Sequence, residues 1–173
     1  MKNVRMEPLE KTIQMAKADP SALEIKLNLE GEWRMDESLP QFGGAIKLPS
    51  GETVMLESDF PPFLGGAGRS PSPLQYCFWG GMACFGSILA VIAAQEKIEI
   101  ESLRIRTKGT IDFSQPLGLS QNPPIHGLTW EVMIKSSASE DTLDRLVELA
   151  EERCPASWMM RNIVPLKTIR VTN

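Results

Sequence analysis

The stretch that decides the fold is SPLQYCFWGGMACFGSILAVIAAQ, residues 72–95. It contains no charged side chain and holds two of the three cysteines of the chain. Its first residues are typical of a helix N-terminus: Ser72 suits the N-cap, Pro73 suits the first helical position, and Gln75 stands where a capping box has Glu or Gln. Because apolar residues recur on every side of this helix, we expect other elements to bury it fully.

A membrane span is the alternative interpretation of the same stretch, because about 20 apolar residues suffice to cross a bilayer. Its interior, however, contains Gln75, three glycines and a serine, and no basic cluster lies on either flank to set an orientation. The rest of the chain alternates like a soluble α+β domain. We therefore expect a buried core helix and no association with a membrane.

The composition excludes several classes of protein. A net charge of −4 and a pI of about 5.1 argue against nucleic acid as the main partner. No basic segment precedes an apolar one at the N-terminus, so we expect no signal peptide. Three cysteines do not make a disulfide framework in a chain of 173 residues. The expected location is the cytoplasm, with reduced thiols.

Metal and cofactor chemistry have few candidate residues. His126, the one histidine, lies in a loop rich in Pro and Gly, and no Cys-x-x-Cys and no Gly-rich phosphate motif is present. Cys77 and Cys84 are about 10 Å apart along a helix axis, which is too far for a shared zinc ion or a mutual disulfide. One histidine also leaves no usual Cys–His or Ser–His–Asp set. We expect no cofactor, and Cys77 as a buried packing residue.

The remaining sequence predicts an α+β order of elements in one domain over residues 1–173, with residues 1–20 as a helical N-terminal extension. Alternating apolar and polar side chains predict strands at 23–30, 102–108 and 128–135. A turn at 49–52 between 45–48 and 53–56 predicts a hairpin, and a last strand is expected near 164–171. Helical periodicity predicts two further helices, at 7–17 and 139–153. The second must end before Pro155, which has no backbone N–H to donate. Gly109 indicates a β-bulge.

Two cysteine motifs complete the pattern. The first comprises the loop at 59–66 and the start of the apolar helix at 72–84, which ends in GGMAC. The second is EERCPAS at 151–157, followed by RNIVP at 161–165. Over roughly residues 23–171 the chain resembles the OsmC/Ohr family of thiol-dependent organic hydroperoxide reductases, and the two motifs are specific in combination.

The resemblance implies an α+β, OsmC-like fold of two small antiparallel sheets around two central helices, assembled as an intertwined homodimer with its sites at the interface. This fold agrees with the order of elements predicted from the pattern. A dimer would also bury residues 72–95 more completely than one small domain. The resemblance further implies an organic hydroperoxide, or another apolar small molecule, and an external dithiol as partners.

The chemistry that the resemblance implies uses two thiols. In the family, one cysteine attacks a hydroperoxide and becomes a sulfenic acid, and a second cysteine condenses with it to a disulfide that an external dithiol reduces. The resemblance implies Cys84 as the peroxidatic residue and Cys154 as the resolving residue. Such a protein protects against oxidative stress.

The thiolate of Cys84 needs a nearby cation, because burial raises the pKa of a thiol. The family supplies an arginine from its N-terminal sheet, held by a glutamate at the start of the cysteine helix. Arg34 is the first candidate for this arginine and Arg69 the second. Leu74 and Gln75 stand where the family has its glutamate, so Gln75 is the candidate site residue in that place.

A second hypothesis keeps the fold without the catalysis. In it, the protein binds an apolar or thiol-bearing ligand at the dimer interface. The lack of an acid at positions 74 and 75 favours this hypothesis. We expect Trp79, Trp130 and Trp158 to be core or interface aromatics, a class of side chain that also lines apolar ligand pockets.

Overall fold

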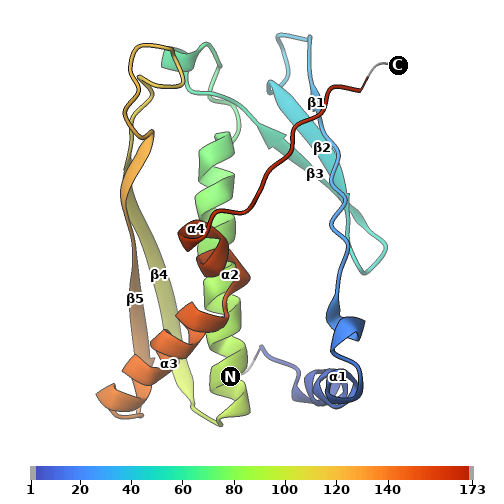
Figure 1. Cartoon of the computed structure of the whole chain (residues 1–173), viewed down its shortest axis with the longest axis vertical. Coiled ribbons are helices and arrows are strands. Elements are labelled where there is room, and N and C mark those ends of the chain that lie inside the picture. The colour runs from blue at the N-terminus through green and yellow to red at the C-terminus, as the bar shows by residue number, and fades with distance from the viewer. Residues whose placement is uncertain (1–2, 172–173) are drawn as a thin grey trace. The chain divides into compact units, whose positions relative to one another are not determined.

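The computed structural model describes residues 3–171 (Figure 1). Within them the chain divides into two compact units, one of residues 7–78 and one of residues 79–171 with the short segment 3–6. The first unit contains a three-stranded sheet and the second a two-stranded sheet, both antiparallel. Helix α2, Pro73–Gln95, begins in the first unit and continues through the second. This is the α+β fold with two small antiparallel sheets that the sequence predicts.

The N-terminal segment contains a helix, as predicted, but lacks the strand predicted after it. Helix α1, Met6–Ala18, confirms the helix expected at 7–17 and is followed by a short 3-10 helix, Pro20–Leu23. The strand expected at 23–30 is wrong: the segment has no regular structure, and Ile25 is 92% exposed. A strand needs a neighbour to receive its backbone hydrogen bonds, and no described strand pairs with this segment.

The sheet of the first unit consists of β1 (Glu32–Trp33), β2 (Phe42–Lys47) and β3 (Thr53–Ser58). Strands β2 and β3 form the predicted hairpin. Across the three strands, Glu32 is opposite Gly43, and Gly43 is opposite Glu57. Opposite residues in a sheet point to the same face. The two glutamates therefore share one face of the sheet, with a glycine between them.

The loop between β3 and α2 is fixed by side chains on both sides. The Oδ2 atom of Asp59, which is buried, accepts hydrogen bonds from the backbone N–H groups of Ala67 at 3.2 Å and Arg69 at 3.0 Å. The side chain of Gln41 makes two further hydrogen bonds to the backbone of the same loop. A short 3-10 helix, Pro62–Leu64, lies inside it.

Helix α2 begins as the sequence predicts. The backbone N–H of Ser72 donates to Oε1 of Gln75 at 2.8 Å, and the N–H of Gln75 donates to Oγ of Ser72 at 3.3 Å. The two residues thus form a capping box around Pro73, the first residue of the helix. The hydroxyl of Tyr76 donates to the backbone carbonyl of Glu57 at 2.9 Å and joins the first turn of α2 to β3.

Only one side of α2 is buried within the chain. Its buried residues are Gly81, Phe85, Leu89, Ile92 and Ala93. By contrast, Trp79 is 63% exposed and Cys77 is exposed. The expectations of full burial for the helix and of a buried Cys77 are therefore wrong for the single chain. An apolar surface that runs all around a helix needs neighbours on every side, and one small sheet with one packed helix covers only part of it.

Helix α2 is also the one helix among residues 3–171 that is long and apolar enough to cross a membrane. A third of the tested window, 33%, is buried inside the protein. The core helix of a soluble protein passes the same test of length and composition.

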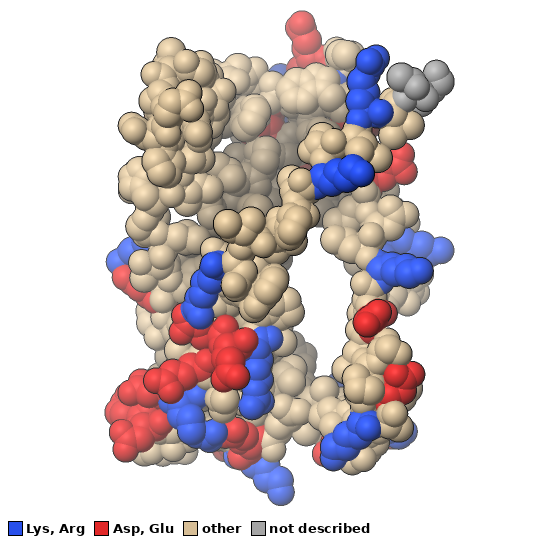
Figure 2. Space-filling model, in the orientation of Figure 1, with Lys and Arg blue, Asp and Glu red and all other residues tan. Residues whose placement is uncertain are grey.

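The sheet of the second unit pairs β4 (Ile100–Ile111) with β5 (Ile125–Ser136). A shift of register at Gly109 confirms the predicted bulge. His126, expected in a loop, instead lies in β5 opposite Thr110, because the strand begins before the residues that alternate most clearly. The loop that joins the two strands shows no charged surface at its tip in Figure 2.

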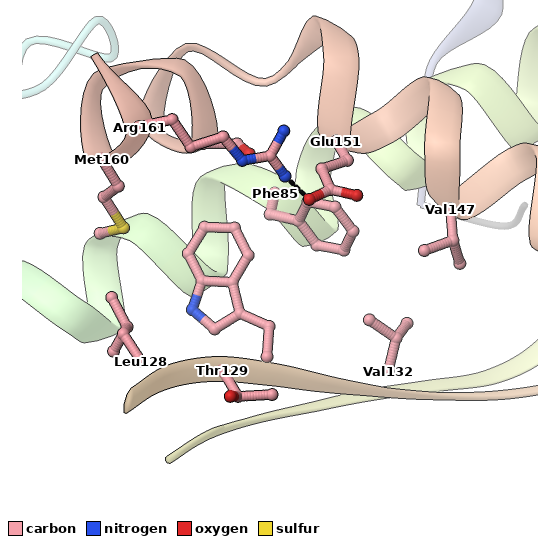
Figure 3. A pocket seen from close by; sticks show the side chains of 10 residues that line it. Phe85, Leu128, Thr129, Val132, Val147, Glu151, Met160 and Arg161 are labelled. Carbon is pink, nitrogen blue, oxygen red and sulfur yellow. Dashed lines mark ion pairs between the residues drawn. The ribbon is translucent and has the colours of Figure 1, made fainter. Parts of the chain in front are cut away.

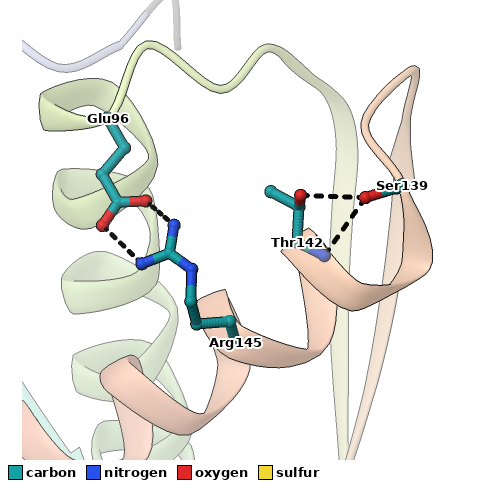
Figure 4. A network of polar contacts seen from close by, with 4 residues as sticks. All are labelled: Glu96, Ser139, Thr142 and Arg145. Carbon is teal, nitrogen blue, oxygen red and sulfur yellow. Dashed lines mark hydrogen bonds and ion pairs between the residues drawn. The ribbon is translucent and has the colours of Figure 1, made fainter.

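Helix α3, Glu140–Arg153, begins at the predicted N-cap, where the side chain of Ser139 accepts the backbone N–H of Thr142 at 3.4 Å (Figure 4). The guanidinium of Arg145 on α3 donates to the carboxylate of Glu96, the residue after α2 (Figure 4). This donation holds the pKa of Glu96 below its ordinary value. The ion pair joins the end of α2 to α3.

The core of the second unit lies between α2 and α3. Its buried residues are Phe85, Leu89, Ile92, Ala93, Leu146, Ala150 and Cys154. The sheet contributes partly buried side chains from alternate positions, namely Leu103, Ile105, Trp130, Val132 and Ile134. Cys154 is thus a core residue as well as a candidate site residue.

The C-terminal segment also departs from the prediction. After helix α4, Pro155–Arg161, the described residues have no regular structure, so the strand expected at 164–171 is wrong. Leu166 is 92% exposed. This segment and the one at 23–30 fail for one reason: each has the apolar content of a strand, but neither has a paired neighbour among the described strands.

Candidate active site

Two thiols from separate motifs come together in the second unit. The Sγ atom of Cys154 donates a hydrogen bond to Sγ of Cys84 across 3.7 Å. Cys84 lies in the middle of α2 and is half-buried, whereas Cys154 is 0% exposed. Both are free thiols. A disulfide has a sulfur–sulfur length of about 2.05 Å, so the two atoms must approach by about 1.7 Å to form one from the observed 3.7 Å.

The position of Cys154 follows from the break between α3 and α4. Pro155 has no N–H to donate, so α3 ends and a new helix begins at the proline. Cys154 ends α3 through its backbone N–H, which donates to the carbonyl of Ala150 at 3.0 Å. It also caps α4, because its Sγ accepts the backbone N–H of Ser157 at 3.4 Å. Cys154 is thus the C-cap of α3 and the N-cap of α4.

The surroundings of Cys154 favour its protonated form. Burial raises the pKa of the thiol above its usual value; the N–H of Ser157 opposes this, and the hydrogen bond to Cys84 adds to it. The net direction is upward. Because only a thiolate is a strong nucleophile, Cys154 is a poor first attacker at neutral pH. Its S–H remains available as a donor to Cys84.

A pocket of about 380 Å³ lies near this pair in the second unit (Figure 3). Most of its lining is apolar and consists of Phe85, Leu128, Trp130, Val132, Val147 and Met160. An ion pair between Glu151 and Arg161 forms its charged part (Figure 3). Neither cysteine lines the pocket, but Phe85, next to Cys84, and Ser157, the donor to Cys154, both do. The volume is at the lower end of the range for small-molecule sites.

The tryptophans expected in the core or at an interface differ in burial. Trp130 is half-buried, contacts the ring of Phe85 and lines the pocket, but its indole Nε1 is buried without a hydrogen-bond partner. Trp79 and Trp158 are 63% and 55% exposed. Within the single chain, therefore, only the first of the three is a packed aromatic.

Arg34 belongs to the first unit and lies directly after β1. Its Nη1 atom donates to Oε1 of Glu57 on β3 at 2.6 Å. The guanidinium passes over Gly43 of β2, where a Cβ atom would be 2.3 Å from Nη2. The arginine side chain is 15% exposed and that of Glu57 is 41% exposed. Arg34 also lines a hollow of about 400 Å³ in this unit.

Sequence reasoning missed Glu57. The family resemblance implied an acid only in the first turn of α2, at position 74 or 75. The signal that could have found it is the hairpin itself: once β2 and β3 are paired, Glu57 is opposite Gly43. A glycine in that place leaves room above the sheet for a long side chain from β1.

The structure gives the other candidate residues of the first unit local partners. Gln75 uses its side-chain oxygen in the capping box with Ser72. Arg69 donates from Nη1 to the backbone carbonyl of Glu37 at 2.6 Å. Among the described residues of the second unit, no Lys, Arg or His side chain hydrogen-bonds the sulfur of Cys84 or Cys154. No group of three or more His, Cys, Asp or Glu residues that could hold a metal ion occurs within 3–171.

Comparison with known sequences identifies the family. Residues 66–169, which are 104 of the 173, match the model of the family described as OsmC-like protein. This chain belongs to the OsmC-like family. The match includes Cys84 and Cys154 but begins at the last residue of the 59–66 loop, after Arg34 and Glu57. A search of curated proteins found no match.

Solved structures share the OsmC-like fold at low sequence identity. An organic hydroperoxide resistance protein OsmC from Legionella pneumophila is 21% identical, with a TM-score of 0.56 over 80% of this chain and 92% of that one. An organic hydroperoxide resistance protein from Elizabethkingia anophelis is 22% identical, with a TM-score of 0.53 over 80% and 91%. A putative one from Vibrio cholerae, with captopril in one of its active sites, is 16% identical, with a TM-score of 0.54 over 80% and 88%.

Proposed function

We propose that this OsmC-like protein is a thiol-dependent peroxidase that reduces organic hydroperoxides. The observation that carries the proposal is the hydrogen bond between the sulfurs of Cys154 and Cys84 at 3.7 Å. The two cysteines come from motifs far apart in the sequence. Several proteins of the same fold are named organic hydroperoxide resistance proteins, which supports the same class of reaction.

The proposed reaction has three balanced steps. The thiolate of Cys84 attacks the terminal oxygen of the hydroperoxide and the O–O bond breaks, which gives the sulfenic acid of Cys84 and an alkoxide that takes a proton from water to become an alcohol. The sulfur of Cys154 then attacks the sulfenic sulfur; a disulfide forms and water leaves. An external dithiol reduces this disulfide by two thiol–disulfide exchanges and is itself oxidised to a disulfide. In this scheme Arg34 stabilises the thiolate of Cys84. The protein acts in the cytoplasm and protects against oxidative stress.

The proposed assembly is a homodimer. Two segments without a strand partner, 23–30 and 164–171, expose apolar side chains at alternate positions, among them Ile25, Leu27 and Leu166 at 92%, 83% and 92%. The outer side of α2 also exposes Trp79. A second copy of the chain would cover such surfaces, which single soluble domains rarely leave open.

The experiment that tests the peroxidase uses the fully reduced protein. One equivalent of cumene hydroperoxide is added, remaining peroxide is measured, and disulfides are mapped by mass spectrometry. We expect consumption of the peroxide and a Cys84–Cys154 disulfide, with Cys77 still a free thiol. A Cys77→Ser variant, which keeps both proposed site thiols, should behave identically. Unconsumed peroxide with both thiols intact would reject the proposed activity.

The second candidate function is the binding of an apolar molecule without catalysis. The apolar pocket near the thiols and the lack of a basic side chain at either sulfur in the described second unit favour it. The probe 1-anilinonaphthalene-8-sulfonate should then become fluorescent in the wild type but not in a Val132→Trp variant, whose larger ring fills the pocket. Binding of the probe together with an absence of peroxide consumption would support this candidate.

A further inference from the structure

We propose that the pocket of the second unit binds a neutral, apolar molecule that carries a hydroxyl group. The inference rests on the second candidate function, the binding of an apolar molecule, and names the class of that molecule. Its polar anchors are two buried groups without a hydrogen-bond partner among residues 3–171, the indole N–H of Trp130 and the hydroxyl of Thr107. Both residues, and all those that line the pocket, belong to the second unit.

The two unpaired groups are neighbours on the inner face of the β4–β5 sheet. Thr107 is directly opposite Trp130 in the register. Opposite residues of an antiparallel pair point to the same face, with Cβ atoms about 5 Å apart. On this face Ile105 and Val132 pack against the core of the unit, and Trp130 lines the pocket. The register therefore brings an N–H donor and a hydroxyl together beside the pocket.

The chemistry of the two groups limits what can satisfy them. A buried polar group without a partner has lost its hydrogen bonds to water and gained none in return. An indole N–H only donates, whereas a threonine hydroxyl both donates and accepts. The missing partner must therefore accept from Trp130, and it may donate to Thr107 or accept from it. A hydroxyl group meets both requirements through a single oxygen atom.

The indole of Trp130 is held in a fixed place. Its ring contacts the ring of Phe85, with centroids 5.2 Å apart. It also lies close to Gly81 of α2, where a Cβ atom would be 3.3 Å from Cζ2 of Trp130 and would overlap Cε of Met160. The glycine thus lets the indole approach the backbone of the helix. A donor held in this way loses little freedom when a ligand binds to it.

The rest of the pocket suits a hydrocarbon body. Phe85 of α2, Val147 of α3 and Met160 of α4 line it, together with Leu128 and Val132 of β5 (Figure 3). Its volume is about 380 Å³. Water is poorly held in a cavity with so few polar groups, whereas apolar molecules are bound there. A ligand with a hydrocarbon body and one polar group therefore matches the lining.

The charges of the lining favour a neutral ligand. Glu151 and Arg161 form an ion pair with each other on one side of the pocket (Figure 3), so their charges cancel. A carboxylate or an ammonium group that entered would leave water without a free counter-charge to meet it. A hydroxyl group carries no charge and leaves the ion pair intact.

The pocket is separate from the two sulfurs, since neither Cys84 nor Cys154 lines it. A molecule bound there would leave both thiols uncovered. The alcohol that the proposed reaction forms from an apolar hydroperoxide belongs to the class of ligand inferred here. The pocket is thus suited to hold the product of the reaction rather than its reacting O–O bond.

The test follows the indole N–H signals of the four tryptophans by NMR in the reduced protein, labelled isotopically at nitrogen. Trp130→Phe identifies the signal of Trp130. The ligand is cumyl alcohol, and its hydrocarbon match is tert-butylbenzene, in which a methyl group replaces the hydroxyl. We expect the alcohol to move the Trp130 indole proton downfield and to bind about tenfold more tightly than the hydrocarbon. Equal dissociation constants, or an unmoved Trp130 proton at saturation, would overturn the inference.

Two threonine variants test the second anchor. Thr107→Val keeps the shape of the side chain and removes its hydroxyl, so the preference for the alcohol over the hydrocarbon should fall about threefold. The matched control is Thr129→Val, because Thr129 also lines the pocket but is exposed, so that its hydroxyl has water as a partner. The control should keep the wild-type preference. An unchanged preference in Thr107→Val, or an equal loss in Thr129→Val, would also overturn the inference.

The outcomes separate this inference from the proposed functions, because no hydroperoxide is present. Equal binding of both ligands would retain the second candidate function and reject its ligand class, whereas binding of neither would reject both. A wild type that prefers the alcohol but does not consume hydroperoxides would reject the peroxidase and keep the inference. Circular dichroism confirms the fold of each variant. If Thr107→Val does not fold, the comparison of the two ligands on the wild type decides.

Discussion

Cys154 donates its thiol hydrogen bond to Cys84 across a sulfur–sulfur distance of 3.7 Å. The donor is the fully buried partner and the acceptor is the half-buried one. In the reduced protein the two sulfurs are therefore already neighbours, and the buried one is the donor. This asymmetry gives the two residues different expected behaviour when either is replaced.

Replacing Cys154 by Ser should stop the reaction at the sulfenic acid of Cys84. The serine hydroxyl cannot form a disulfide, but it is a preferred N-cap and should keep helix α4 in place. After one equivalent of cumene hydroperoxide, a dimedone adduct on Cys84 should appear in Cys154→Ser and not in the wild type. Mass spectrometry of the peptide that contains Cys84 checks this. Equal amounts of adduct in both proteins would show that Cys154 does not resolve the sulfenic acid.

Stability should fall with rising pH because of Cys154. Burial raises the pKa of this thiol in the folded protein, whereas an unfolded thiol titrates near pH 8.5. The contribution of the group to the free energy of unfolding is complete below about pH 8.5 and is lost as the pH rises through the higher folded pKa. Urea unfolding of the reduced protein at pH 7, 8.5 and 10 measures this contribution to the free energy of unfolding. Relative to Cys154→Ser, the wild type should lose stability over this range; a constant difference would contradict the assignment.

Gly43→Ala should displace the guanidinium of Arg34. The new methyl group would lie 2.3 Å from Nη2, and such overpacking costs roughly 1–3 kcal/mol of unfolding free energy. The matched control is the double variant Gly43→Ala/Arg34→Ala, in which the clash is removed. We expect a positive coupling free energy between the two substitutions, measured by urea unfolding. If the losses of unfolding free energy in the two single variants add up to the loss in the double variant, the Arg34 guanidinium does not lie over Gly43 in solution.

The proposed homodimer predicts a mass of twice 19.2 kDa in solution. Ile25→Ser/Leu27→Ser replaces two side chains that are 92% and 83% exposed in the single chain. Because they contact little within the chain, their loss should lower the dimer fraction without changing the circular dichroism spectrum of the monomer. Light scattering after size exclusion measures the mass. A wild type of 19.2 kDa at all concentrations would reject the dimer.

Local signals in the sequence predicted the parts of the fold that depend on neighbouring residues. The capping box of Ser72 and Gln75, the break at Pro155 and the bulge at Gly109 all follow from the chemistry of a few adjacent side chains. The β2–β3 hairpin was predicted because its turn and both strands are close in the sequence. Each of these features is decided by residues that are close together in the sequence.

Features that depend on distant partners could not be predicted in the same way. Alternation at 23–30 and the apolar residues of 164–171 favour strands, but a strand also requires a neighbour. The exposure of Cys77 likewise depends on which elements reach the outer side of α2. At the candidate site, the cysteine pair followed from motif resemblance, whereas Glu57 emerged only from the register of a sheet.

The sulfur of Cys154 is also the cap of α4, accepting the N–H of Ser157 at 3.4 Å. Serine is a preferred N-cap, so a single change of Cys154 to serine would remove the proposed resolving thiol and keep the cap of α4. Selection for the cap of α4 alone would therefore not preserve the Cys154 thiol. Under the proposed reaction, a cysteine at this junction supplies both the cap and the resolving thiol, whereas a serine there would keep the cap alone.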